Sequence, residues 1–253
     1  MKQNILFLLL YAIISLPAIA QKNKTVSSPT SAFPRDSLFA LQEKIYNAAI
    51  RYNDLKAAQH ALYAMIALQP GRTGLKDTLA YLYYNEGNYV QVVLLGKDIL
   101  SAKPDNPEIL ELVAVSQQNL GLLKDALENF EKLYNITQNA VHRYNIASLQ
   151  YMLKRYGECS ESLNAILGLP DNPGNVTIST STGESQQVPL KAAAFNMRGV
   201  IALEIGQPEV AIQNFQKALE LFPDFVLAKG NLEKARAEKI PSEQKKQTPS
   251  KGQ

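Results

Sequence analysis

The chain has 253 residues, of which 46% are hydrophobic, and a formal net charge of +3 at pH 7. So small a charge gives no reason to expect nucleic acid or an acidic membrane surface as the main partner. The single cysteine, Cys159, excludes an internal disulfide, so the fold must be held together by apolar packing.

Residues 1–20 have the three parts of an export signal: Lys2 as the positive start, an apolar run from Ile5 to Ile14, and the small-residue cleavage pattern Ala18-Ile19-Ala20. A membrane-spanning helix needs roughly 20 consecutive apolar residues, and this run is shorter. An uncleaved anchor is the alternative. We expect cleavage before Gln21 and a mature chain without an integral membrane span. The export signal and the lack of disulfides favour the periplasm or cell envelope of a bacterium, or secretion.

Residues 21–35 are rich in Lys, Ser, Thr and Pro and are predicted to form a flexible linker. The chain then repeats itself about every 34 residues, and we expect residues 36–240 to form a single helical array. One set of small residues marks the repeat at steps of 34, 34, 33 and 52 residues: Ala58, Val92, Ala126, Cys159 and Ala211. The last step is one repeat plus an insertion of 18 residues.

A second set of residues lies 12 positions before each member of the first: Tyr46, Ala80, Ala114, Ala147 and Gly199. Two antiparallel helices approach closely only where neither presents a bulky side chain, so the paired small residues predict helical hairpins. Tyr46 departs from this rule. The register places five hairpins at residues 39–72, 73–106, 107–139, 140–172 and 192–225.

The C-terminal end of the array carries further signals. Residues 226–239 suit an amphipathic helix that caps the last hairpin, because a solenoid must shield its terminal apolar face. Residues 241–253 are polar and are predicted to be a disordered tail.

Residues 173–191 interrupt the array between the fourth and fifth hairpins. Apolar and polar side chains alternate over residues 176–180, and Gly183-Glu184 could turn the chain so that residues 186–190 return as a second strand. A two-stranded ribbon is marginal in water, so it would have to lean on the helices or on a partner. A flexible Ser/Thr-rich loop is an equal alternative.

The hairpin at residues 192–225 resembles the tetratricopeptide repeat (TPR) family. The resemblance rests on Phe195-Asn196-Met197-Arg198-Gly199, followed by Gly206, Ala211, Phe215, Ala218 and Pro223. It implies an all-α fold, a right-handed solenoid of about five TPR hairpins with a C-terminal capping helix. It also implies that the first helices of the hairpins line a concave groove that receives a peptide or protein partner.

The positions that match this concave face are expected to form a protein-binding groove. They are Glu43, Asn47, Asp77, Tyr81, Tyr84, Glu111, Val115, Gln118, Tyr144, Ser148, Tyr151, Asn196 and Val200. Tyrosine suits a recognition surface because it combines a large apolar ring with a polar tip. Some of the four tyrosines, Tyr84 and Tyr151 especially, could instead pack between hairpins.

The same face carries the acidic residues Glu43, Asp77 and Glu111. Some family members hold a terminal carboxylate with basic groove residues, and an acidic rim argues against such a ligand here. We therefore expect a neutral or basic protein or peptide partner.

No catalytic, cofactor or metal site is expected. The two histidines, His60 and His142, lie on different hairpins without ligands at metal spacing and are interpreted as surface or groove residues. Neither a glycine-rich phosphate loop nor a nucleophile elbow occurs. Cys159 is interpreted as a core residue that packs like alanine.

These observations predict a non-catalytic scaffold or adaptor of the cell envelope, not an enzyme. The alternative is a structural subunit of a larger envelope assembly, such as secretion, outer-membrane or motility machinery, joined through convex or terminal surfaces.

Overall fold

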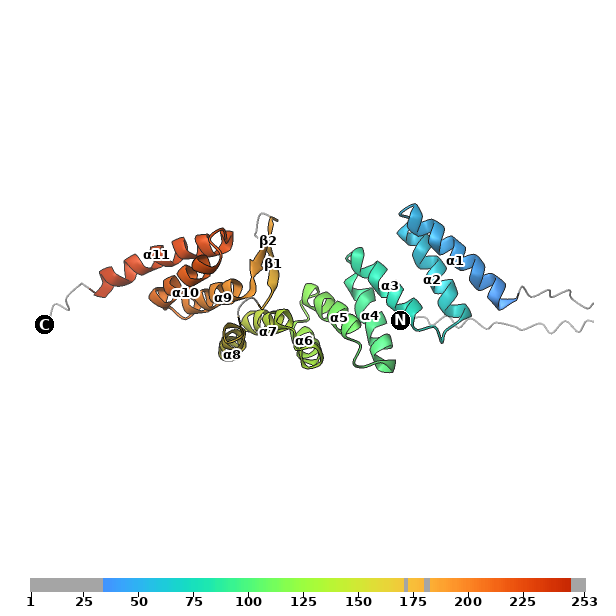
Figure 1. Cartoon of the computed structure of the whole chain (residues 1–253), viewed down its shortest axis with the longest axis horizontal. Helices are drawn as coiled ribbons and strands as arrows, with labels where there is room; N and C mark the ends of the chain where they lie inside the picture. The colour runs from blue at the N-terminus through green and yellow to red at the C-terminus, as the bar shows by residue number, and fades with distance from the viewer. Residues whose placement is uncertain (1–33, 171–172, 180–182, 247–253) are drawn as a thin grey trace, which may run out of the picture. The chain divides into compact units, whose positions relative to one another are not determined.

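The computed structural model describes residues 34–170, 173–179 and 183–246 (Figure 1). The predicted export signal lies outside the described residues, as do most of the predicted linker and residues 247–253 of the predicted tail. No helix in the described part of the chain is long and apolar enough to cross a membrane.

The described residues form eleven α-helices and two β-strands. In chain order they are α1 (Arg35–Arg51), α2 (Leu55–Leu68), α3 (Gly74–Asn85), α4 (Tyr89–Ala102), α5 (Pro107–Asn119), α6 (Leu123–Thr137), α7 (Ala140–Met152), α8 (Tyr156–Leu167), β1 (Asn175–Ser179), β2 (Ser185–Pro189), α9 (Leu190–Glu204), α10 (Pro208–Leu221) and α11 (Val226–Lys246).

Consecutive helices pack as hairpins: α1 with α2, α3 with α4, α5 with α6, α7 with α8, and α9 with α10. Each second helix also packs against the first helix of the next hairpin, and the hairpins follow one another in chain order (Figure 1). Helix α11 packs on α9 and α10. The solenoid of five hairpins with a C-terminal capping helix, predicted from the sequence, is confirmed.

The small residues that define the repeat are buried where the helices of a hairpin meet. Ala58, Val92, Ala126, Cys159 and Ala211 are all fully buried. The Cys159 thiol donates a hydrogen bond to the carbonyl oxygen of Ala147 at 3.1 Å, so the two sets of small residues face each other across the fourth hairpin. Burial raises the pKa of Cys159 to about 12, so the thiol is a protonated core group, as predicted.

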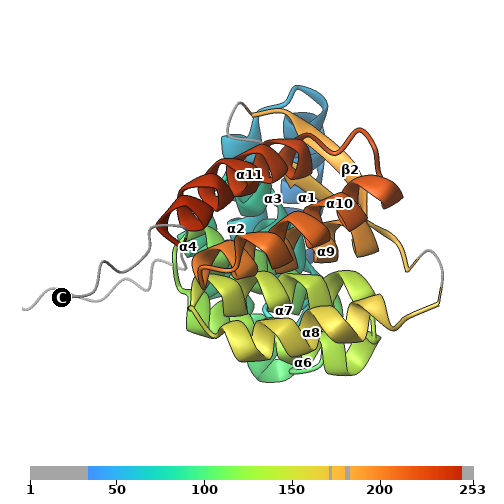
Figure 2. The ribbon, with the colours of Figure 1, turned by 90° about the vertical axis from the view of Figure 1, so that its left-hand side faces the viewer.

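The insertion folds as a β-hairpin that leans on the helices. Strands β1 and β2 pair antiparallel, with Val176 opposite Val188. Both valines belong to the apolar cluster that includes residues of α7, α8 and α9. The side chain of Gln186 accepts a hydrogen bond from the N–H of Val226 and donates one to the carbonyl oxygen of Asp224, which ties β2 to the turn before α11. Figure 2 shows β2 beside this turn. The hairpin alternative is therefore correct, and the loop alternative is wrong.

The predicted boundaries differ from the structure at both ends. Helix α1 begins at Arg35, the last residue of the predicted linker. Helix α11 continues to Lys246, so the tail predicted from residue 241 is wrong for residues 241–246. Glu, Gln and Lys are strong helix formers, so a polar composition alone does not end a helix.

Replacement of Gly199 by alanine should destabilise the fold. An added Cβ would clash with the ring of Phe215, whose side chain is fully buried. We expect Gly199→Ala to lower the free energy of unfolding by roughly 1–3 kcal/mol, the usual cost of overpacking. The control is Gly230→Ala in α11, where the added Cβ meets nothing within 4 Å and stability should hold or rise by up to about 1 kcal/mol. Equal stability of Gly199→Ala and the parent in chemical denaturation would contradict this packing.

Candidate protein-binding groove

Four of the predicted groove residues come together in one pocket between α3 and α5, the first helices of the second and third hairpins. The pocket has a volume of about 220 Å³. Its lining residues are Tyr81 and Tyr84 from α3, and Glu108, Glu111, Leu112 and Val115 from α5.

The pocket follows from helical spacing. On α5, residues 108, 111, 112 and 115 recur at three- and four-residue steps, so they share one face of the helix. Glu108 and Leu112 were not among the predicted groove residues. The same spacing, counted from Glu111 and Val115, would have identified both.

Tyr81 stands at the mouth of this pocket among acidic groups. Its side chain is 39% exposed. Burial is the main cause that raises the pKa of Tyr81, and the carboxylates of Glu108, Asp77 and Glu111 raise it further. The hydroxyl therefore lies in a field of negative charge and remains protonated.

Tyr84 forms the more buried wall of the pocket. Its ring packs edge-on against Tyr89, with the two ring centroids 6.0 Å apart. Burial raises the pKa of Tyr84, and Tyr89 and Glu111 add smaller effects in the same direction. Tyr84 therefore both packs within its hairpin and lines the pocket.

Asp77 supplies an unusual polar atom beside Tyr81. Its Oδ1 oxygen is buried and has no hydrogen-bond partner among the described residues. A buried acceptor that is left unpaired destabilises a protein by about 1–3 kcal/mol.

Glu111 links the pocket to the next hairpin. One of its carboxylate oxygens lies 3.8 Å from Nε2 of His142 on α7. His142 is buried, so the interpretation of this histidine as a surface or groove residue is wrong. Its Nδ1 lies 2.8 Å from the hydroxyl oxygen of Thr137. His142 faces the preceding hairpin. The hydroxyl of Thr137 on one side of the ring and the carboxylate of Glu111 on the other allow a histidine to be buried there.

Two predicted groove residues are buried and present no surface to a partner. Tyr144 is only 8% exposed and belongs to the same apolar cluster as Val176 and Val188 of the β-hairpin. Asn196 is buried as well, and its side-chain oxygen accepts a hydrogen bond from Asn231 of α11 at 2.9 Å. Both residues are covered by elements that lie outside the repeat: the insertion and the capping helix.

Tyr151 is engaged in packing between hairpins, the role anticipated for it as an alternative. Its hydroxyl donates a hydrogen bond to Glu204 of α9 at 3.4 Å, and its ring centroid lies 5.8 Å from that of Tyr156. The remaining predicted residues are spread over four hairpins and do not line the pocket. Glu43 and Asn47 are exposed, and Gln118, Ser148 and Val200 are half-buried.

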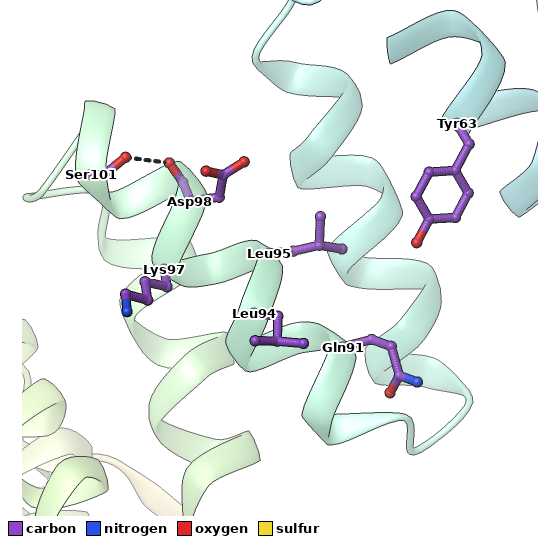
Figure 3. Close-up of a pocket in the computed structure, with 7 residues that line it drawn as sticks. All are labelled: Tyr63, Gln91, Leu94, Leu95, Lys97, Asp98 and Ser101. Carbon is purple, nitrogen blue, oxygen red and sulfur yellow. Dashed lines mark hydrogen bonds between the residues drawn. The ribbon is translucent and has the colours of Figure 1, made fainter. Parts of the chain in front are cut away.

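A second pocket lies between the second helices of the first two hairpins and was not predicted (Figure 3). Its volume is about 400 Å³. Tyr63 comes from α2, and α4 contributes Gln91, Leu94, Leu95, Lys97, Asp98 and Ser101. Leu94 is 64% exposed. The residues at the same register in the other hairpins are polar (His60, Glu128, Glu161 and Gln213), so an exposed leucine is particular to α4.

Within the described part of the chain, no group of His, Cys, Asp and Glu residues could hold a metal ion. The architecture defines a class, the helical-repeat proteins. Residues 192–225 match the sequence model of the tetratricopeptide repeat. No curated protein sequence matches the chain.

Many solved structures have a similar fold, YrrB and MamA among them. YrrB, described as a TPR protein with an unusual peptide-binding site, is 16% identical with a TM-score of 0.59, over 78% of this chain and 98% of YrrB. MamA from Desulfovibrio magneticus RS-1, from residue 41 to its end, is 13% identical with a TM-score of 0.58, over 75% of this chain and 97% of that one. One hairpin of the chain thus matches the tetratricopeptide repeat model, and the chain shares the fold of a tetratricopeptide repeat protein.

Acidification should destabilise the protein through His142. Burial holds the pKa of His142 below its ordinary value of 6.5, and Glu111 opposes this effect only in part. Because the folded state favours the neutral ring, the stabilising contribution is complete above the unfolded-state pKa and is lost as the pH falls below it.

The free energy of unfolding should fall as the pH is lowered below about 6.5, and it should fall less steeply in His142→Gln than in the parent. The two slopes should differ by at most about 1.4 kcal/mol per pH unit. Denaturation curves at a series of pH values measure this slope. His60 is exposed, so His60→Gln should keep the parental slope. A parental slope in His142→Gln would show that another group controls the acid response.

Proposed function

We propose that this chain is a non-catalytic scaffold that binds a protein or peptide partner in the groove of its first helices, with the α3–α5 pocket as the main contact. The observation that supports this most strongly is that predicted groove residues from two different hairpins meet in one pocket. Tyr81, Tyr84, Glu111 and Val115 come from two hairpins and line one pocket. An apolar floor with an amphipathic aromatic rim and a few charges is the usual composition of a recognition pocket.

The charges around the pocket support a basic partner segment. The carboxylates of Asp77, Glu108 and Glu111 all act on Tyr81. We infer that one basic side chain of the partner lies beside Tyr81 while an apolar neighbour contacts Leu112 and Val115.

The similarity to YrrB agrees with this proposal, since that protein is described as having a peptide-binding site. At 16% identity the likeness is one of fold. The argument for binding therefore rests on the pocket of this chain and its charges.

Tyr81→Ala should weaken partner binding at least tenfold, because central aromatic residues dominate the energy of protein interfaces. The experiment captures a partner from an envelope extract with the tagged chain and then measures its affinity for parent and variants. The control is Tyr63→Ala, which removes an exposed tyrosine from α2 instead. If Tyr63→Ala abolished binding and Tyr81→Ala bound fully, the partner would bind to the second helices, and the proposed groove would be wrong.

The charge of the partner is tested separately. Asp77→Asn and Glu108→Gln remove two carboxylates and leave Glu111 with its partner His142. If the partner is basic, the double variant should bind more weakly and respond less to salt than the parent. Unchanged affinity and salt dependence would contradict the electrostatic part of the proposal.

We also propose that the chain is exported and acts in the cell envelope. The support is the sequence of residues 1–20, with a basic start, an apolar run and a small-residue cleavage pattern. Expression of the full chain in a bacterium should yield a periplasmic protein whose mass corresponds to a start at Gln21. A cytoplasmic protein that retains residues 1–20 would contradict export.

The pocket between α2 and α4 favours a second candidate function, a structural subunit of a larger envelope assembly. Exposed apolar groups such as Leu94 and Tyr63 fit a permanent interface better than a purely solvated face. A subunit should co-purify in a fixed stoichiometric complex that Leu94→Glu disrupts and Tyr81→Ala leaves intact. The adaptor proposal requires the opposite response.

A further inference from the structure

Helix α1 carries an apolar stripe that the described residues leave uncovered. The stripe consists of Leu38, Leu41, Ile45 and Ala48 on α1 and Tyr52 directly after it, spaced alternately by three and four residues, with Leu38 half-buried. Leu41 is 51% exposed, Ile45 40% and Tyr52 78%. The core of the first hairpin uses a neighbouring face of the same helix, with Phe39, Tyr46 and Ala49. The exposed stripe is therefore additional to the face that the hairpin needs for its own packing.

The repeat register shows what such a stripe does elsewhere in the chain. The positions that correspond to residues 41, 45 and 48 are Leu75, Leu79 and Leu82 on α3, Ile109, Val113 and Ser116 on α5, His142, Ile146 and Leu149 on α7, and Ala194, Arg198 and Ile201 on α9. All of them except Leu75 and Arg198 are buried.

The residues that cover these positions come from the preceding hairpin. Leu79 and Leu82 share a cluster with Leu62 of α2. Ile146 and Leu149 share one with Phe130 of α6. The stripe on α1 therefore occupies the positions that, in the later hairpins, contact the preceding hairpin. At α1 the described residues include no preceding hairpin to cover them.

The other end of the array is finished differently. Helix α11 buries Ala228, Leu232 and Ala235, and its other positions from residue 229 to 238 are almost all polar or charged. A polar outer face is what a terminal repeat requires to remain soluble. The outer face of α11 offers few apolar side chains that could pack on α1. Head-to-tail stacking of two copies would therefore not bury the stripe.

Basic groups line the free edge of the stripe. Lys44 and Arg51 precede Ile45 and Tyr52 by one residue, on the side of α1 away from its own core. Both are exposed, and neither forms an ion pair with the residues that the structure describes. An antiparallel pair of α1 helices, symmetric about Ile45, would bring Lys44 beside its own copy. The charges therefore disfavour a second copy and favour an acidic flank on the partner.

We propose that α1 is a docking site for an amphipathic helix of another protein, one that carries an aliphatic stripe with Asp or Glu along one side and takes the place of a preceding hairpin. The contact would extend the array by one layer. This surface is separate from the α3–α5 pocket, so either site can exist without the other.

A peptide from this chain provides a defined probe. Residues 122–138 cover α6, whose Leu127, Phe130 and Leu133 lie in the cluster that buries Ile146 of α7. Glu131 follows Leu127 by one helical turn, so the peptide also has an acidic group beside its apolar face. Isolated helices of this length are marginal in water, so the peptide is synthesised with a hydrocarbon staple on its polar side.

Fluorescence anisotropy measures binding of the stapled peptide to the full chain. We expect saturable binding that weakens at least tenfold in Ile45→Glu. Lys44→Glu combined with Arg51→Glu should also weaken it and reduce its salt dependence. The control is Val210→Glu on α10, which adds a charge at another exposed apolar residue and should bind as the parent does.

Two results would overturn the proposal. The first is that the parent shows no saturable binding of the peptide, or that Ile45→Glu binds the peptide as tightly as the parent does. Circular dichroism checks that the Ile45→Glu variant keeps the helix content of the parent. The second comes from sedimentation: a concentration-dependent dimer of the parent that Ile45→Glu converts to a monomer would make a second copy the occupant. Loss of peptide binding with intact groove binding would leave the function proposed above untouched.

Discussion

The close approach of two helices within each hairpin is the constraint on which the rest of the structure depends. It is easiest where both helices carry small residues, as Ala147 and Cys159 do in the fourth hairpin. At Gly199 even a methyl group would collide with Phe215. These contacts fix the geometry of each hairpin, so the first helices of neighbouring hairpins lie at a regular distance from each other. The pocket between α3 and α5 follows from that distance.

The pocket and the stability of the array share a residue. Glu111 lines the pocket and also lies beside the buried His142 of the next hairpin. A partner that draws the carboxylate toward itself would remove the charge that partly offsets the burial of that histidine. The proposed binding in the groove would therefore be coupled to the protonation of His142, and such a coupling would act in both directions.

The sequence was sufficient for features that repeat and insufficient for those that do not. Periodic small residues predicted all five hairpins, and two residues matched to the concave face of the family, Glu111 and Val115, do line the α3–α5 pocket. Tyr144 and Asn196 occupy the same register but are buried, because the β-hairpin and α11 pack there and neither element belongs to the repeat. The pocket at Leu94 was missed for a related reason: it arises from one apolar departure on an otherwise polar face.

Hydrogen exchange of the chain with and without its captured partner tests the central claim most directly, because it maps the contact without any substitution. If the groove of the first helices is the binding surface, protection should appear in residues 77–84 of α3 and 108–115 of α5 and spare α4. Protection confined to α4, with α3 and α5 exchanging as in the free chain, would contradict the account.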